Sequence, residues 1–273
     1  MSMLKSFLSG KHSIITSGTG SGKTEAFLMP IFAQIFIEMH DVKHPWQKPS
    51  PRLENQNFWK NENPEYVNTR LNESRPAGIR ALVVYPMNAL VEDQMSRMRS
   101  ALCSKDADTF FREDCEGNRI YIGRYNGSTP VTRPLKTESG SIDKNKNREL
   151  AKEMNRIEQF SMELGKSKTT EWKYSFPIPV SNFHDLNSSE LINRWDMQET
   201  PPDIFITNFS MLSIILMRSY EDNIFKKTRD WLSGEDLRNE GLDEKSIEEI
   251  KENRIFHLVL DELHLYRGTS GTE

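Results

Sequence analysis

The sequence predicts an α/β fold with a mainly parallel sheet and helices on both faces. Short, almost wholly apolar runs alternate with longer segments whose apolar residues recur at helical spacing. Such nearly continuous apolar strands are typical of a sheet that is covered on both sides. The runs are residues 12–16, 80–85, 119–123, 203–207 and 256–261. Ligands of such sheets bind beyond the carboxyl ends of the strands, so the turns after these runs are the candidate site.

Helices are expected between the strands. Residues 23–39 have helical spacing of apolar side chains, and Pro30 within them predicts a bend. Asn88 is expected to cap the next helix, whose apolar face would be Leu90, Val91, Met95, Met98 and Leu102. Ser210 is expected to cap a short apolar helix, and a polar helical stretch follows at 221–252.

Two long insertions interrupt this pattern, at about 40–78 and 131–200. The first is rich in proline and asparagine, which is typical of irregular structure. It contains His40 and His44, whose spacing could place two metal ligands on a helix face. Pro45 and the absence of a third nearby ligand favour surface histidines instead.

The second insertion contains a charged segment of helical pattern, residues 145–163. Its lysines and arginines could indicate contact with RNA or DNA. Acidic residues are interleaved with them, so the sequence favours a solvated helix face.

Composition narrows the class of protein. The chain has 273 residues and a formal net charge of −4, so any nucleic-acid contact must come from local groups and not from bulk charge. Cys103 and Cys115 do not form a C-x-x-C pair, which predicts two free thiols. No apolar run approaches the roughly 18 residues of a membrane span, and no secretory signal opens the chain. We expect a cytoplasmic protein that does not associate with membranes.

A glycine-rich segment near the start of the chain predicts a phosphate-binding loop. It follows the first apolar run, opens the helix at 23–39, and reads Ser17, Gly18, Thr19, Gly20, Ser21, Gly22, Lys23, Thr24. The glycines let the backbone wrap closely around a phosphate, the lysine adds a positive charge, and the threonine hydroxyl can reach a metal ion. Ser17 departs from the usual G-x-x-x-x-G-K-[ST] pattern, which has glycine at that position. The alternative interpretation is a flexible turn.

Asp261 and Glu262 supply what such a loop needs. They follow the last apolar run directly, so the aspartate can help to hold Mg²⁺ together with Thr24. The adjacent glutamate can polarise the water that attacks the γ-phosphate. A lone Asp-Glu pair is weak evidence, but its combination with Lys23 and Thr24 in one chain predicts a site for ATP and Mg²⁺.

These segments resemble the motifs of superfamily 2 DEAD/DEAH-box helicases, in the order of that family. Residues 17–24 are similar to motif I, whose first position is commonly alanine or serine. Residues 85–94 resemble motif Ia, residues 207–212 motif Ib, and residues 261–264 motif II. Further segments, at 123–127, 194–198 and 266–269, are similar to bacterial and archaeal helicases of the MrfA kind.

The resemblance implies a P-loop NTPase of the RecA-like kind, with one helicase ATP-binding domain over residues 1–273. It implies catalytic roles for Lys23, Asp261, Glu262 and His264. Of these, His264 would couple the state of the bound nucleotide to the rest of the helicase motor. Residues 17–24 would bind ATP, and Thr24 with Asp261 would hold Mg²⁺.

The resemblance also implies contacts to the sugar-phosphate backbone of one strand, with DNA favoured over RNA, through Pro86, Asn88, Gly127, Thr207 and Asn208. Backbone amides, short polar side chains and helix N-termini bind phosphates without reading sequence. Ordinary turn and cap chemistry is the alternative for these five residues. The family leans toward DNA repair and defence against foreign DNA.

The sequence is expected to form the first motor lobe only, without the second RecA-like lobe, which would be supplied in cis or in trans. Alone it should bind ATP but hydrolyse it poorly. Three hypotheses remain at this point: the ATP-binding lobe of a helicase or translocase, an ATP-binding switch or remnant that acts through a partner, and a nucleic-acid-binding module with a vestigial nucleotide site. The intact Lys23, Thr24, Asp261 and Glu262 argue against the third.

Overall fold

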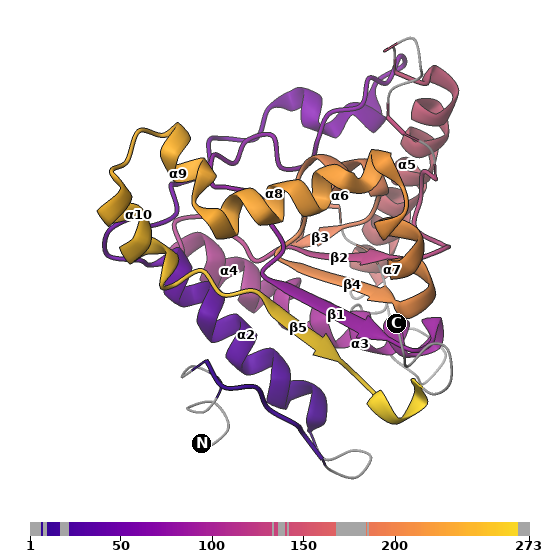
Figure 1. Ribbon diagram of the computed structural model, residues 1–273. Coiled ribbons are helices and arrows are strands. Elements are labelled where there is room, and N and C mark those ends of the chain that lie inside the picture. Colours follow the sequence, from indigo (N-terminus) through magenta and orange to yellow (C-terminus); the bar gives the residue numbers. More distant parts are fainter. Residues whose placement is uncertain are drawn as a thin grey trace.

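Five parallel strands form the sheet of the computed structural model, which describes residues 7, 10–16, 22–132, 134–135, 140, 142–167, 184 and 186–266. All arrowheads point the same way in Figure 1. The strand order is β3-β2-β4-β1-β5. The strands are β1 (Ala81–Tyr85), β2 (Ile122–Tyr125), β3 (Glu190–Leu191), β4 (Ile204–Asn208) and β5 (His257–Leu260). The α/β, RecA-like fold class is thereby confirmed.

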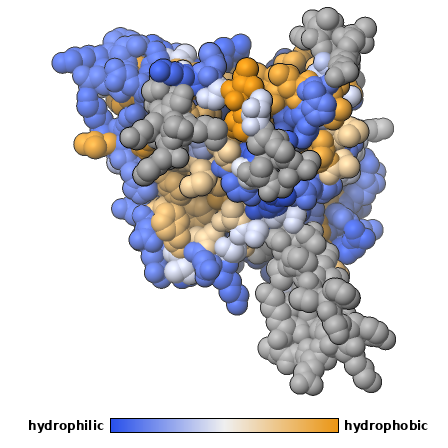
Figure 2. All heavy atoms as spheres, turned by 90° about the horizontal axis from the view of Figure 1, so that it is seen from below, coloured by the Kyte–Doolittle hydropathy of each residue, from blue (hydrophilic) through white to orange (hydrophobic). Residues whose placement is uncertain are grey.

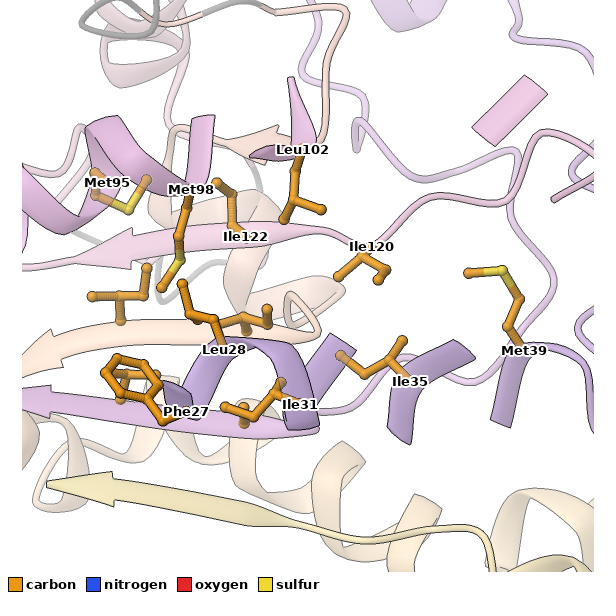
Figure 3. Close-up of a cluster of buried hydrophobic side chains, with 14 of the residues drawn as sticks. Phe27, Leu28, Ile31, Ile35, Met39, Met95, Met98, Leu102, Ile120 and Ile122 are labelled. Carbon is orange, nitrogen blue, oxygen red and sulfur yellow. The ribbon is translucent and has the colours of Figure 1, made fainter. Parts of the chain in front are cut away.

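Three helices cover one face of the sheet. They are α2 (Lys23–Met39), α3 (Asn88–Leu102) and α4 (Lys105–Glu113). Alternate residues of β1, namely Ala81, Val83 and Tyr85, join the buried cluster beneath these helices. Figure 3 shows the apolar side chains of α2 and α3 converging beside Ile120 and Ile122. The predicted methionine and leucine stripe of α3 is therefore core.

The opposite face is covered by α6 (Arg194–Glu199), α7 (Phe209–Leu216) and α8 (Asp222–Ser233). The other residues of β1, Leu82 and Val84, face this side with Phe205 of β4. They belong to the same buried cluster as Ile215 of α7 and Ile224 of α8. Because consecutive strand residues point to opposite faces, both faces of β1 are buried, as its unbroken apolar run predicts.

Six further helical elements complete the described part of the chain. These are η1 (Glu54–Lys60), α5 (Lys144–Ser167), η3 (Ser219–Glu221), α9 (Glu235–Asn239), α10 (Glu244–Lys251) and η4 (Leu263–Leu265). The polar stretch predicted as helical from 221 onward is thus η3 followed by three helices. Gly234 lies between α8 and α9 with φ of 76°, a left-handed conformation that glycine adopts without strain.

Several sequence-based expectations need correction. Residues 12–16 do not form a strand; apart from the half-buried Ile15 they are exposed, and no strand pairs with them. A strand needs a neighbour for its backbone groups, and a short apolar run does not by itself provide one. The strand expected at 119–123 begins later, at Ile122. Helix α2 is continuous through Pro30.

The predicted helix caps are also shifted. Asn88 is the first residue of α3, and Met87 occupies the cap position. The cap of α7 is Asn208 and not Ser210, because the Asn208 side chain accepts a hydrogen bond of 2.7 Å from the backbone N–H of Met211. In both cases an asparagine at the carboxyl edge of the sheet has a different task from the one expected.

The segments predicted as insertions pack against each other. Trp59 and Tyr66 of the first segment share a buried cluster with Met154 of α5 and Trp195 of α6. The second segment also contributes β3 and α6 to the main body of the fold. Its last part is therefore continuous with the sheet, whereas η1 and α5 lie outside it (Figure 1).

A buried ion-pair network joins the first segment to the amino ends of the strands. Asp203, which precedes β4, accepts two hydrogen bonds from Arg75, of 2.7 and 2.8 Å, and lies 3.2 Å from Arg80. Arg80 in turn donates to Glu38 at the end of α2. Burial alone would raise the pKa of Asp203, but the two guanidinium groups lower it to about 2.

The surface at the β5 edge is partly apolar. Leu258 and Leu260 of β5 are 56% and 47% exposed, and Leu263 and Leu265 of η4 are similarly exposed. Figure 2 shows apolar patches among hydrophilic residues on the face seen from below. No helix in the described part of the chain is long and apolar enough to cross a membrane.

Candidate nucleotide site and strand-binding edge

The turn after β5 places two carboxylates beside each other. Asp261 continues the strand, because its N–H donates to the carbonyl of Val84 on β1. Glu262 follows with φ of 50°, a left-handed conformation that is uncommon for a residue with a side chain. A hydrogen bond of 2.9 Å from the Glu262 N–H to Asp261 Oδ1 holds this bend. The two carboxylates therefore diverge from one fixed turn, with His264 Nδ1 3.2 Å from Glu262 Oε2.

The start of α2 meets this turn from the opposite end of the sequence. Lys23 Nζ lies 3.4 Å from Glu262 Oε1, and both side chains are part-exposed. Gly22 occupies the cap position of α2 with φ of 80°, and Thr24 is buried at the first turn. Ser17, Gly18, Thr19, Gly20 and Ser21 lie outside the described residues. The described half of the predicted loop thus lies beside the predicted catalytic carboxylate.

The donor set suits a magnesium–nucleotide complex. Mg²⁺ is bound in such sites by one or two protein oxygens together with phosphate oxygens and water, and Thr24 with Asp261 offers such a pair. Within the described ranges, no group of three or more His, Cys, Asp and Glu residues could hold a metal. His44, considered above as a ligand, lies 2.9 Å from Glu240 instead.

Two tyrosines that the sequence did not single out stand beside Asp261. Tyr85 ends β1, is fully buried, and its hydroxyl has no hydrogen-bond partner among the described residues. Tyr266 donates from its hydroxyl to the carbonyl of Val84 at 3.2 Å. Burial and the charge of Asp261 raise the pKa of Tyr266 to about 12, and the same two causes raise the pKa of Tyr85. Both phenols therefore stay neutral near neutral pH.

Three asparagines join the carboxyl ends of three adjacent strands. Asn88, after β1, accepts hydrogen bonds at its side-chain oxygen from Asn208, at the end of β4, and Asn126, after β2. The distances are 2.5 and 3.3 Å. Asn126 was not predicted as a site residue, although its position at a strand end before Gly127 is the signal that could have found it. The triad fixes three turns relative to each other.

The remaining residues predicted to contact nucleic acid differ in accessibility. Gly127 and Asn88 are exposed, and Pro86 is half-buried. Thr207 is fully buried, and its hydroxyl donates to the carbonyl of Tyr125 at 2.7 Å. Thr207 therefore positions the neighbouring β-strand. Asn208 is also buried, at 8% exposed, whereas Asn88 and Gly127 lie at the surface of this edge.

The two MrfA-like segments contact each other. Arg194 of α6 donates to the carbonyl of Asn126 at 2.7 Å and lies 4.8 Å from the ring centre of Tyr125. Gln198 donates to the Tyr125 hydroxyl at 3.1 Å. Residues 194–198 thus act as a brace behind the loop that contains Gly127. The segment 266–269 is described only at Tyr266.

The comparisons with known proteins agree with this geometry. The family model described as "DEAD/DEAH box helicase" matches residues 1–118. Residues 1–118, which are less than half of the chain, therefore resemble the DEAD/DEAH box helicase family. It is also similar to the Druantia protein DruE of Escherichia coli (strain UMEA 4076-1), with 32% identity over 301 aligned positions and 99% of this chain covered. The chain spans 14% of the length of that relative, and no solved structure matches it.

The match and the five-stranded parallel sheet together support a helicase-type motor domain. The matched residues contain the start of α2, β1 and α3. The carboxylates of the turn after β5 lie beyond residue 118. The pairing of β5 with β1, the hydrogen bond from Asp261 to Val84 and the contact between Lys23 and Glu262 join them to the matched part.

Proposed function

We propose that the chain is the ATP-binding motor lobe of an ATP-dependent nucleic-acid helicase or translocase. The observation that supports this most is the contact between Lys23 and Glu262, which are 239 residues apart in sequence. It unites the cation of the predicted phosphate loop with the carboxylate of the predicted catalytic turn. The match to the DEAD/DEAH box family supports the same assignment.

Each residue would have a separate task in the nucleotide site. Residues 17–24 would bind the phosphates of ATP through backbone N–H groups, and Lys23 would contact the β- and γ-phosphates. Thr24 and Asp261 would hold Mg²⁺, which when bound neutralises charge on those phosphates. Glu262 would accept hydrogen bonds from the attacking water, and His264, beside Glu262, would link the nucleotide state to neighbouring parts of the machine.

A strand of nucleic acid would lie along the turns that the asparagine triad joins. Pro86, Asn88, Gly127 and Asn208 would contact the sugar-phosphate backbone, with Thr207 positioning the edge from beneath. Such contacts bind any sequence, and we propose DNA rather than RNA as the partner. Hydrolysis would need a second RecA-like lobe, in cis or in trans, because related systems gain roughly 10³- to 10⁵-fold from an arginine supplied to the phosphates.

Thermal unfolding with and without Mg-ATP tests the nucleotide site. A ligand at ten times its Kd stabilises the folded state by about 1.4 kcal/mol, which for a domain of this size raises the Tm by roughly 3 °C. Lys23→Ala should abolish this rise, whereas Lys245→Ala, an exposed lysine of α10, should leave it intact. The absence of a rise in the unmutated protein at millimolar Mg-ATP would disprove the site. A rise without any binding of strands would favour an ATP-binding switch that acts through a partner.

A further inference from the structure

Helix α5 carries a stripe of exposed cations. Lys144, Arg148, Lys152 and Arg156 recur every four residues and are all exposed. Four residues advance an α-helix by about 6 Å and turn it by slightly more than one full turn, so these side chains follow one another along one side. The stripe belongs to none of the motifs assigned to the motor.

The acidic residues of α5 pair with only one cation of this stripe. Glu158 turns toward the first predicted insertion, where it accepts from Trp59 at 3.1 Å and pairs with Lys60. Glu149 pairs with Lys146, which is outside the stripe. Glu153 pairs with Arg156 at 2.9 Å, at one end of it. Among the described residues, no acid lies within ion-pair distance of the other three cations, although Glu149, Glu153 and Glu163 are interleaved with the stripe along the helix.

The stripe leads into a cavity at the carboxyl edge of the sheet. The cavity has a volume of about 460 Å³, within the range of small-ligand sites. Arg156, its ion-pair partner Glu153, and Phe160 of α5 line one side. Ser128 of the loop after β2 lines the other, with Arg124 of β2, which pairs with Glu92. Phe160 is 44% exposed. Ser128 directly follows Gly127, so the cavity adjoins the surface proposed above for the strand.

We propose that α5 and the loop after β2 form an additional binding site for single-stranded nucleic acid, which continues the strand-binding edge. One base enters the cavity and stacks on Phe160, and the phosphates that follow it contact Arg148 and Lys152. Aromatic rings combined with cations that track the backbone are the means by which proteins hold single strands without reading sequence. This inference rests on the proposed function, because it needs a nucleic-acid strand bound at the carboxyl edge of the sheet.

Fluorescence anisotropy with labelled oligonucleotides of 20 thymidines or 20 uridines tests the site, with a salt series for each protein. Removing one phosphate-binding cation lowers the slope of log K against log salt by about 0.7 for single strands. R148E/K152E should therefore lower the slope by about 1.4 and weaken binding at least tenfold at low salt. F160A should weaken binding about tenfold with an unchanged slope, because stacking is not ionic.

K226E/R229E is the matched control, since both residues are exposed cations on one helix, α8, away from the cavity. It makes the same change in charge and should leave affinity and slope near those of the unmutated protein. Equal effects of the two double variants would overturn the site on α5. The rise in Tm with Mg-ATP, measured on every variant, reports folding and tests the nucleotide site separately. If the unmutated protein binds neither oligonucleotide, both strand proposals fail, while the nucleotide proposal is decided by its own measurement.

Discussion

Asp203 shows how a buried charge is tolerated at the amino ends of the strands. Its carboxylate receives both arms of the Arg75 guanidinium, and the backbone N–H of Tyr121 donates to it at 2.7 Å. A buried charge is stable only when it is paired and its remaining lone pairs are used, and these contacts meet that condition. Because Arg75 comes from the first predicted insertion, the same pairing attaches this segment to the sheet.

Asp203→Asn should destabilise the protein by about 3–5 kcal/mol, because it leaves Arg75 and Arg80 buried without their counter-charge. Urea unfolding measures this. The matched control is Asp230→Asn, whose carboxylate is 34% exposed and lies 3.4 Å from Lys226; it should cost less than about 1 kcal/mol. Similar losses from the two variants would show that the network is not a buried one.

The pH dependence of stability gives the same variant a second readout. The folded pKa of Asp203, about 2, lies below its ordinary value of 3.8, so the unfolded state binds more protons in this range. The contribution is present above pH 4 and is lost as the pH falls toward 2. In Asp203→Asn the free energy of unfolding should therefore fall less steeply with decreasing pH over that window. The difference in slope should be at most that of one bound proton.

At the scale of elements, Asn208 combines a structural task with a proposed functional one. Its side-chain oxygen caps α7, and its side-chain nitrogen donates to Asn88. An N-cap needs only an oxygen acceptor, which aspartate also supplies. The two tasks can therefore be separated by substitution.

Asn208→Ala should cost about 1 kcal/mol in urea unfolding through loss of the cap, whereas Ser210→Ala, at the position expected from the sequence, should cost little. Asn208→Asp keeps an acceptor for the cap but can no longer donate to Asn88. It should weaken oligonucleotide binding, because it breaks the asparagine triad and adds a negative charge where the nucleic-acid strand is proposed to lie. If Asn208→Asp binds strands as well as the unmutated protein does, Asn208 is a cap and does not touch the strand.

The same elements show what the sequence could predict. Residues 80–85 and 203–207 were predictable as strands because they are buried on both faces, and helices α2 and α3 because their apolar residues repeat at helical spacing. Residues 12–16 were not, because an apolar run does not reveal whether a partner strand lies beside it. The cap positions were missed because they depend on where each strand ends.

The candidate site was predictable only in part, for a similar reason. Lys23 and Glu262 were named from their motifs, and their contact follows from the shared edge of a parallel sheet. Asn126 acts through a tertiary contact to Asn88, and the charge of Asp261 raises the pKa of Tyr85. No local pattern in the sequence reveals such neighbours. The sequence also did not show that Glu158 of α5 turns toward Trp59 and Lys60.

At the scale of the whole molecule, the two edges of the sheet have opposite character. The amino edge is closed by the Asp203 network and by Glu38, which also accepts hydrogen bonds from Trp46 and Trp231. The carboxyl edge carries exposed polar turns, joined by the asparagine triad and braced by Arg194. A fixed amino edge lets the carboxyl edge keep its geometry while its surface stays open to ligands.

Trp59 tests whether the two predicted insertions act as one body. It is 2% exposed and shares a core with Tyr66 and Trp195, and its ring N–H donates to Glu158 of α5. Trp59→Ala should cost about 3–5 kcal/mol locally. In hydrogen exchange, the amides of α5 should then lose as much protection as those of η1, although the two elements are far apart in sequence.

The matched control for that exchange experiment is Trp231→Ala, which removes an equally buried tryptophan from α8 on the other side of the ion-pair network. It should reduce protection in α8 and leave α5 more protected than Trp59→Ala does. If α5 keeps its protection in Trp59→Ala, the helix is held to the protein by other contacts. Its cation stripe would then be positioned independently of the first segment, and the shared core would be only a point of contact between two separate bodies.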